Sequence, residues 1–234
     1  MPVGPPLLLL VAEDVKQSPD IENYPAKQTW QSSERAARYR VSRTPTRYTR
    51  YHREDAIITD WLSELPRGAV VLDCPCGTGR LLPVFAQMGL GYVGADFSRA
   101  MIAEARQAVP EMKVHGFVNA DAAKLPFRDS TVDSVVLWRF FHHLPNPRAR
   151  EAILREAARV TRRQVLVSFY HAVSFTALRR AVQKSAFGRK EFGQAITHWR
   201  FQAEAERSGL RVVEFRSYHK YVSINWFVHL QKAG

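Results

Sequence analysis

The sequence is poor in cysteine: of its 234 residues only Cys74 and Cys76 carry a thiol, two positions apart. A disulfide framework is thereby excluded, and a reducing, cytoplasmic setting is expected. A closed zinc site needs about four ligands, and no histidine stands at metal-ligand spacing beside this pair. We therefore predict that the chain binds no metal and that both thiols are small apolar fillers of a turn.

Long hydrophobic runs are also lacking. The run Leu7–Val11 is far shorter than the roughly 20 apolar residues that span a membrane. The first part of a signal peptide contains Lys or Arg. The six residues before this run contain neither. Residues 1–25 are therefore expected to form a loose N-terminal leader.

Acidic residues are outnumbered: 34 Lys and Arg against 22 Asp and Glu give a formal net charge of +12. This balance favours anionic partners such as phosphates, nucleic acid or lipid headgroups, although solubility alone explains it equally well. Residues 26–65 interleave arginines with tyrosines, a combination that binds anions and stacks on rings. We predict a helical substrate lid there; a solvated helix face is the alternative. The residues are Arg35, Arg38, Arg40, Arg43, Arg47, Arg50 and Arg53 with Tyr39, Tyr48 and Tyr51.

What the sequence does contain, between residues 66 and 234, is an alternation of short apolar strands with helices. Strands are expected at 69–73, 91–96, 113–121, 134–139, 164–170, 211–218 and 221–231, and helices at 80–88, 99–109, 147–161 and 196–208. Such alternation predicts an α/β fold with a parallel sheet covered on both faces. Only His219 and Lys220 separate the last two predicted strands, too few for a parallel crossover. The final strand should therefore be antiparallel.

A loop with two glycines, VLDCPCGTGR at residues 71–80, follows the first predicted strand. Gly77 and Gly79 permit tight backbone conformations, and ligands of open α/β sheets bind at the carboxyl ends of strands. A dinucleotide site has the pattern G-x-G-x-x-G, but Leu82 takes the third position here. The carboxylate of Asp73 also suits a cationic sulfur better than a pyrophosphate.

This loop resembles the first motif of the class I S-adenosylmethionine-dependent methyltransferases. These enzymes have a Rossmann-like domain, and the resemblance is to methyltransferase domains of types 11 and 25. The resemblance covers Gly68 to Tyr170, and Pro75 departs from it where the family often has glycine. It implies a seven-stranded, mostly parallel sheet with an antiparallel last strand and helices on both faces. It also implies a 66–234 core that binds S-adenosylmethionine.

The resemblance assigns roles at the strand ends. Asp96, in VGADFSRAMIAEAR, matches the acid that binds the ribose hydroxyls, and Asp121, in NADAAKLPF, matches the acid that accepts from the adenine amino group. A helix cap is the alternative for either acid. The implied cofactor-binding residues are Asp73, Cys74, Pro75, Cys76, Gly77, Gly79, Asp96, Phe97, Asp121, Ala122 and Trp138.

The stretch VDSVVLWRFFHHLPNP resembles the fourth motif, whose strand end faces the methyl-transfer centre. The candidate catalytic residues are Arg139, His142 and His143. A histidine can take a proton near pH 7, and Arg139 can pair with a substrate anion or with the carboxylate end of the cofactor. Structural histidines and a surface ion pair are the alternatives.

Residues 171–200 are expected to form a cap insertion with an apolar face on which Phe175 and Leu178 lie. That face packs on the core, closes the pocket or makes peripheral contact with a membrane. The favoured function is methylation of a small-molecule or lipid-linked acceptor with an anionic group. An RNA methyltransferase is the less favoured alternative, because WRFFHH replaces the Asn-Pro-Pro-Tyr-like motif of enzymes that methylate base amines. A non-catalytic S-adenosylmethionine-binding module is the third. The sequence carries no signal for the acceptor atom or the oligomeric state.

Overall fold

The computed structural model describes residues 32, 34, 36–37, 45–107, 114–177, 179 and 194–233, with backbone alone for 45–50. The strands are β1 Val70–Asp73, β2 Gly91–Asp96, β3 Gly116–Asn119, β4 Val132–Leu137, β5 Thr161–His171, β6 Ala195–Ile196, β7 Leu210–Ser217 and β8 Asn225–Lys232. The helices are α3 Pro45–Leu62, α4 Leu82–Gln87, α5 Arg99–Gln107, the short 3-10 helix η3 Phe141–His143, α6 Pro147–Val160 and α8 His198–Glu206. The predicted leader lies outside the described residues, as does half of the predicted cap, namely 178 and 180–193.

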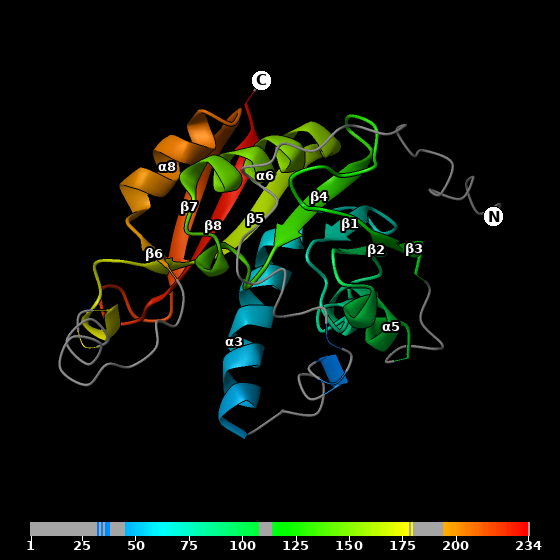
Figure 1. Cartoon of the computed structure of the whole chain (residues 1–234), viewed down its shortest axis with the longest axis horizontal. Helices are drawn as coiled ribbons and strands as arrows, with labels where there is room; N and C mark the ends of the chain where they lie inside the picture. Colours follow the sequence, from blue (N-terminus) through cyan, green and yellow to red (C-terminus); the bar gives the residue numbers. More distant parts are fainter. Residues whose placement is uncertain are drawn as a thin grey trace.

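The strands form one sheet in the order β3-β2-β1-β4-β5-β8-β7 (Figure 1), with β6 paired to the end of β5. β8 runs antiparallel to both of its neighbours, β5 and β7, and the remaining pairs are parallel. This confirms the predicted α/β class, the mostly parallel sheet and the antiparallel last strand.

Two details of the C-terminal third differ from the prediction. The described chain has an additional strand, β6, which has only two residues and therefore no apolar pattern of its own. The connection between β7 and β8 spans residues 218–224 rather than two residues, because Tyr221 adopts a left-handed conformation (φ 63°) within a turn. The apolar run that begins at Tyr221 is therefore partly a turn, and β8 begins at Asn225.

Helices cover both faces of the sheet, because its strands carry apolar side chains on both sides. Leu72 of β1 packs in a core with Ile153 of α6 and Phe201 of α8. The preceding residue, Val71, faces the opposite core with residues of α3 and α4, among them Ile58. Figure 1 shows α6 and α8 together at one side of the sheet and α5 near β2 and β3.

Helix α3 is fastened to strands that come much later in the chain. The Trp61 indole N–H donates to Glu214 on β7 at 2.9 Å, and Arg216 pairs with Asp60 at 2.6 Å. The Gln164 amide donates to the Trp61 carbonyl at 3.3 Å. These contacts hold α3 across β5 and β7, so that its preceding turns lie beside the ends of β1 and β4.

Within the described ranges, no helix combines the length and the apolar character that crossing a bilayer requires.

Candidate functional site

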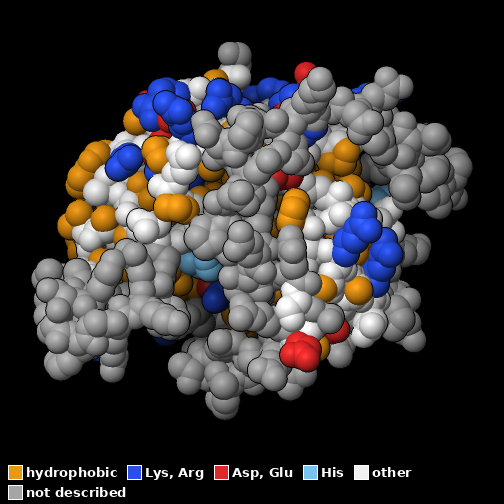
Figure 2. Space-filling view, in the orientation of Figure 1, with side chains coloured by type: hydrophobic (Ala, Val, Ile, Leu, Met, Phe, Trp, Pro, Cys, Tyr) orange, Lys and Arg blue, Asp and Glu red, His pale blue; other side chains and the backbone are white. Residues whose placement is uncertain are grey.

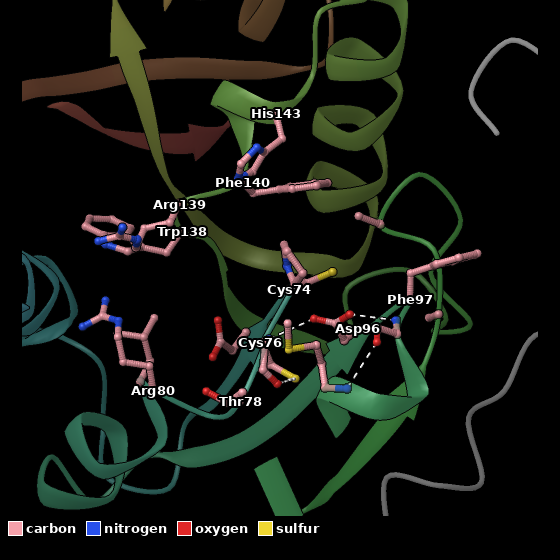
Figure 3. Close-up of a pocket in the computed structure, with 18 residues that line it drawn as sticks. Cys74, Cys76, Thr78, Arg80, Asp96, Phe97, Trp138, Arg139, Phe140 and His143 are labelled. Atoms are coloured by element: carbon pink, nitrogen blue, oxygen red, sulfur yellow. Dashed lines mark hydrogen bonds between the residues drawn. The ribbon is translucent and has the colours of Figure 1, made fainter. Parts of the chain in front are cut away.

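A cavity of about 140 Å³ opens at the carboxyl ends of β1, β2 and β4 (Figure 3). The chain proceeds from β1 to one side of the sheet and from β4 to the other, and such a reversal is the usual ligand position in this architecture. Figure 3 shows Asp96 and Phe97 toward one end and Arg80, Trp138 and Arg139 toward the other. The sequence-predicted residues that line the cavity are Asp73, Cys74, Pro75, Cys76, Gly77, Asp96, Phe97, Ala122, Trp138, Arg139 and His143.

The glycine loop after β1 places bare backbone against the cavity. Gly77 has φ 53°, and a Cβ built on it would meet no atom within 4 Å. Gly79 also has a left-handed φ, of 75°, but its Cβ would come within 3.3 Å of Ala105 on α5. Gly79 does not line the cavity. The first glycine thus leaves room for a ligand, and the second lets the loop pack against a helix.

Asp96 ends β2 and ties this loop to the sheet. Its carboxylate accepts from the Gly77 N–H at 2.9 Å and from the Ser98 N–H at 2.8 Å. Burial raises the pKa of Asp96 to about 6, although these two hydrogen bonds oppose the shift. Because each carboxylate oxygen accepts two hydrogen bonds, Asp96 keeps acceptor capacity for a ligand in the cavity.

Asp73 ends β1 and lines the same cavity. It is buried, and the Tyr92 hydroxyl donates to it at 3.1 Å. Burial raises the pKa of Asp73 to about 7, against the effects of the Tyr92 hydrogen bond and the positive charge of Arg80. A cation that enters beside a buried carboxyl with a raised pKa stabilises its ionised form.

Helix α3 contributes a buried carboxylate that the sequence analysis missed. Glu54 is only 2% exposed. It accepts from the Trp138 indole N–H at 3.0 Å, from Arg80 at 3.2 Å and from Arg139 at 3.3 Å. One α3 side chain therefore orients three residues of the cavity wall. The sole sequence signal was an adjacent pair of acids, Glu54 and Asp55, within an arginine-rich segment.

Tyr51 lies one turn before Glu54 and faces the same two arginines. The guanidinium carbons of Arg80 and Arg139 lie 4.8 Å and 5.4 Å from the centre of its ring. Asp55 pairs with Arg80 at 2.7 Å. Both cations of the wall are thus held between carboxylates and an aromatic ring, which fixes their positions.

The end of β4 supplies the opposite part of this wall. Arg139 has a left-handed φ of 56°, and its N–H donates to the Ser168 hydroxyl on β5. Trp138 stacks on Phe227 of β8, with ring centres 5.0 Å apart. The positive φ turns Arg139 out of the strand and toward Glu54.

The two candidate histidines occupy different places. His143 lines the cavity, and burial together with the charge of Arg139 lowers its pKa. His142 stacks on Tyr170 at 4.1 Å and borders a smaller cavity beside Ser168 and Asn225. Only His143 is therefore placed to meet a ligand in the main cavity.

Of Asp121 and the predicted lid arginines, only Asp121 and Arg53 have side chains whose place relative to the cavity is described. Asp121 does not line it, and its carboxylate accepts from the Ala123 N–H at 3.0 Å, as an acid that caps its own turn does. Of the predicted arginines only Arg53 has a described side chain, which lies 6.0 Å from the Tyr218 ring. The predictions for the remaining lid residues fall outside the described residues or side chains; these are Arg35, Arg38, Arg40, Arg43, Arg47, Arg50, Tyr39 and Tyr48.

Both cysteines are buried and carry free thiols. Burial raises the pKa of Cys74 and of Cys76, and the carboxylates of Asp96 and Asp73 raise both further. A thiol held in its protonated form is a poor metal ligand and a poor nucleophile. In the part of the chain that the structure describes, no three metal-binding side chains come together.

Comparison with known proteins gives one domain and several relatives. A family model described as a methyltransferase domain matches residues 72–169. A demethylmenaquinone methyltransferase from Beutenbergia cavernae is 30% identical over 171 residues, 64% of this chain and 69% of that protein. A phosphatidylethanolamine N-methyltransferase from Cereibacter sphaeroides is 38% identical over 100 residues, which are 42% of this chain and 47% of that protein. The chain therefore spans about half the length of this second relative.

Other similar proteins act, by their names, on other acceptors. A tRNA (carboxymethyluridine(34)-5-O)-methyltransferase from Arabidopsis thaliana is 30% identical over 105 residues, 45% of this chain and 24% of that protein. Among solved structures, a magnesium protoporphyrin IX methyltransferase from Synechocystis with bound SAH superposes with a TM-score of 0.70 at 18% identity. That match covers 89% of this chain and 98% of the other. At this identity the superposition shows a shared fold.

Proposed function

The chain belongs to the class I S-adenosylmethionine-dependent methyltransferases, and on this premise we propose that it methylates a small-molecule or lipid-linked acceptor with an anionic group. The proposal rests on the acceptor end of the cavity, where an aromatic wall surrounds two arginines that are already paired with carboxylates. We also place the reaction in the cytoplasm, since the sequence has only two cysteines and no disulfide framework.

The residues of the cavity fit the cofactor. When bound, S-adenosylmethionine supplies an electrophilic methyl group on a cationic sulfur, next to a ribose and an amino-acid group. Asp96 has acceptor capacity for hydroxyl groups, Asp73 is a buried carboxyl that a cation would favour as an anion, and Gly77 leaves its side of the loop open. Phe97, partly exposed beside Asp96, offers an apolar face for a base.

His143 is the residue we assign as general base. Its lowered pKa keeps the imidazole neutral at pH 7, the state that accepts a proton. Arg139, with more than a quarter of its side chain exposed, is assigned to orient an anionic group of the acceptor. A guanidinium has five N–H donors, so Arg139 can contact Glu54 and an acceptor oxygen together.

The arrangement of charge favours a small or lipid-linked acceptor over a polynucleotide. A nucleic-acid track needs a row of cations that successive phosphates neutralise. At this wall Arg80 is paired with both Glu54 and Asp55, which leaves Arg139, itself in contact with Glu54, for one anionic group. Figure 2 shows Lys and Arg gathered in two places, along the upper rim of the molecule over α6 and α8 and in a smaller group at the right near β2 and β3. These helices lie to one side of the sheet rather than around the cavity. The names of two relatives, a phosphatidylethanolamine and a demethylmenaquinone methyltransferase, agree with a lipid acceptor.

The experiment is a transfer assay with S-adenosylmethionine labelled on its methyl group. The purified protein is incubated separately with a total lipid extract, a water-soluble extract and total RNA of the source cells. We expect label in the lipid or water-soluble fraction. The same metabolite should carry no label in extracts of a deletion strain that is complemented with the Asp96→Ala variant. Label found only in RNA, and released by ribonuclease, would transfer the assignment to RNA.

RNA methylation is the second candidate, supported by the tRNA methyltransferases among the relatives and by the net charge of +12. It predicts binding to tRNA that weakens steeply with salt, because phosphate contacts release counterions. A non-catalytic binding module predicts cofactor binding without label in any fraction.

A further inference from the structure

A second surface of interest lies at the same edge of the sheet as the cavity. Two connections meet there: residues 172–177 follow β5, and residues 218–224 join β7 to β8. The Phe175 N–H donates to the Tyr221 carbonyl at 2.8 Å, and the Thr176 hydroxyl donates to the Val222 carbonyl at 2.7 Å. Figure 1 shows the two connections side by side below β6. We name residues 173–176 and 219–222 the paired tip.

The paired tip exposes large apolar side chains. Val173 is 49%, Phe175 65%, Tyr221 52% and Val222 52% exposed. Elsewhere in the described residues only Phe97, Trp199 and Val213 are large, apolar and exposed. Apolar side chains gathered at one exposed point mark a contact surface in a soluble protein.

The display of these side chains is fixed by the backbone. The Val222 and Ser223 N–H groups both donate to the His219 carbonyl, at 3.1 Å and 2.9 Å, and close a turn. Tyr221 sits in this turn with φ 63°. The turn uses backbone atoms, and so do the hydrogen bonds from the Phe175 and Thr176 N–H groups to the Tyr221 and Val222 carbonyls. The side chains of Phe175 and Val222 can therefore be replaced without removing these hydrogen bonds.

The two segments that form the tip carry no acidic side chain. The segments 171–177 and 218–224, HAVSFTA and YHKYVSI, contain no Asp or Glu. Lys220 lies with its ammonium 5.7 Å from the centre of the Tyr221 ring, and Arg179 is exposed just beyond the first segment. Aromatic and aliphatic side chains beside Lys and Arg are the composition of surfaces that enter the headgroup region of anionic bilayers.

We propose that the paired tip docks this protein on a bilayer that contains anionic lipid. The apolar side chains enter the boundary between headgroups and acyl chains, and Lys220 and Arg179 contact the headgroups. Because β5 and β7 end at the edge where β1, β2 and β4 also end, docking brings the mouth of the cavity to the membrane side. This inference rests on the proposed function, because docking is useful to the enzyme if its acceptor is a lipid-linked molecule in the bilayer.

The test is flotation of the whole protein with vesicles of phosphatidylcholine that contain phosphatidylglycerol as a minority component. The test variant is Phe175→Gln with Val222→Gln, and the matched control is Val213→Gln, an exposed apolar residue on β7 away from the tip. We expect the double variant to lower the partition coefficient by at least about tenfold, and Val213→Gln to leave it unchanged. Lys220→Gln should weaken binding to the anionic vesicles and leave the weak binding to pure phosphatidylcholine as it is.

Calorimetric binding of S-adenosylmethionine is the control for folding in each variant. Absence of flotation with anionic vesicles, or equal flotation of the double variant, would overturn the proposal. So would a concentration-dependent dimer in sedimentation that the double variant abolishes while flotation persists, because the tip would then join two copies. Methylation of lipid in detergent without flotation would leave the proposed function standing, and flotation with label only in RNA would leave the docking surface standing.

Discussion

The two ends of the cavity are built in different ways. The end around Asp96 and Gly77 is formed by one loop and the ends of two adjacent strands, and its carboxylate is held by backbone N–H groups. The end around Arg139 is formed by side-chain pairs between α3 and β4, with Glu54 and Trp138 separated by 84 positions. The first end is local in sequence and the second is assembled from distant parts of the chain.

The two ends are therefore supported by different interactions. The end around Asp96 depends on backbone N–H groups and on a glycine with a left-handed φ. The acceptor end depends on the single buried carboxylate of Glu54, which orients Trp138, Arg80 and Arg139. Substitutions at the two ends should therefore affect different steps of the reaction.

The largest expected effect is on the chemical step at the acceptor end. His143→Gln should lower kcat about 100-fold, the usual contribution of a general base, with cofactor affinity unchanged. In the unmodified protein the lowered pKa of His143 keeps the base neutral until the pH falls below the ordinary histidine range. The acid limb of the kcat profile should therefore lie below about pH 6.5 and vanish in the variant. The exposed His115→Gln is the control; an unaltered kcat in His143→Gln would mean that the acceptor loses its proton without this base.

At the other end, Asp96→Ala should weaken binding of S-adenosylmethionine by about 1.5–3 kcal/mol, because a charged acceptor of hydrogen bonds is lost. Titration calorimetry measures this directly. Asp129→Ala removes an exposed carboxylate that pairs with Arg159 and should leave the affinity unchanged. Equal affinity in a folded Asp96→Ala protein would show that the ribose is bound by another residue.

Glu54→Gln tests the pairing that sets the acceptor end apart. We expect kcat/KM for the acceptor to fall at least about tenfold, or 1.4 kcal/mol, because Arg139 and Trp138 lose their common partner. Cofactor affinity should stay within about threefold, or 0.7 kcal/mol. Asp60→Asn, an α3 acid that pairs with Arg216, is the matched control. A loss of cofactor affinity as large as that of acceptor turnover would mean that the two ends are not separate.

The smallest expected effect is the release of a proton when the cofactor binds. Burial raises the pKa of Asp73 to about 7, so part of the protein carries this proton at pH 7. A cationic ligand lowers that pKa, so binding of S-adenosylmethionine at pH 7 should release a fraction of a proton. Calorimetry in two buffers of different ionisation enthalpy measures the release, which Asp73→Asn should abolish. A wild-type protein that releases none would place the sulfonium away from Asp73.

The same contrast explains which parts of the fold and of the site could be predicted from the sequence. The alternation of apolar runs predicted the strands of the parallel core, and Gly91–Asp96 was predicted to the residue. The loop residues 73–77 could be placed at the cavity because they directly follow a strand, and parallel strands end at one edge. β6 could not be found, since two residues carry no pattern and pair only because β5 extends to His171.

Glu54 could not be found for a different reason. A buried acid on a helix is indistinguishable in sequence from a solvated one, and its partners come 26 and 84 positions later. Asp121 has the spacing of a ligand-binding acid, and its Oδ1 accepts from the Ala123 N–H within its own turn. Its role toward the adenine stays a prediction, because spacing does not distinguish such a local hydrogen bond from a contact with a ligand.

The fastening of α3 has a consequence for synthesis on the ribosome. Its partners Glu214 and Arg216 follow Trp61 and Asp60 by 153 and 156 positions. At about 5–20 residues per second, the helix emerges roughly 8–30 s before those partners do. Throughout that interval Trp61 and Asp60 lack these two partners, although other strands of the same core, beginning with Val71 of β1, have already been made. The acceptor end of the cavity is likewise completed only when the last strands have been made, because Trp138 stacks on Phe227 of β8.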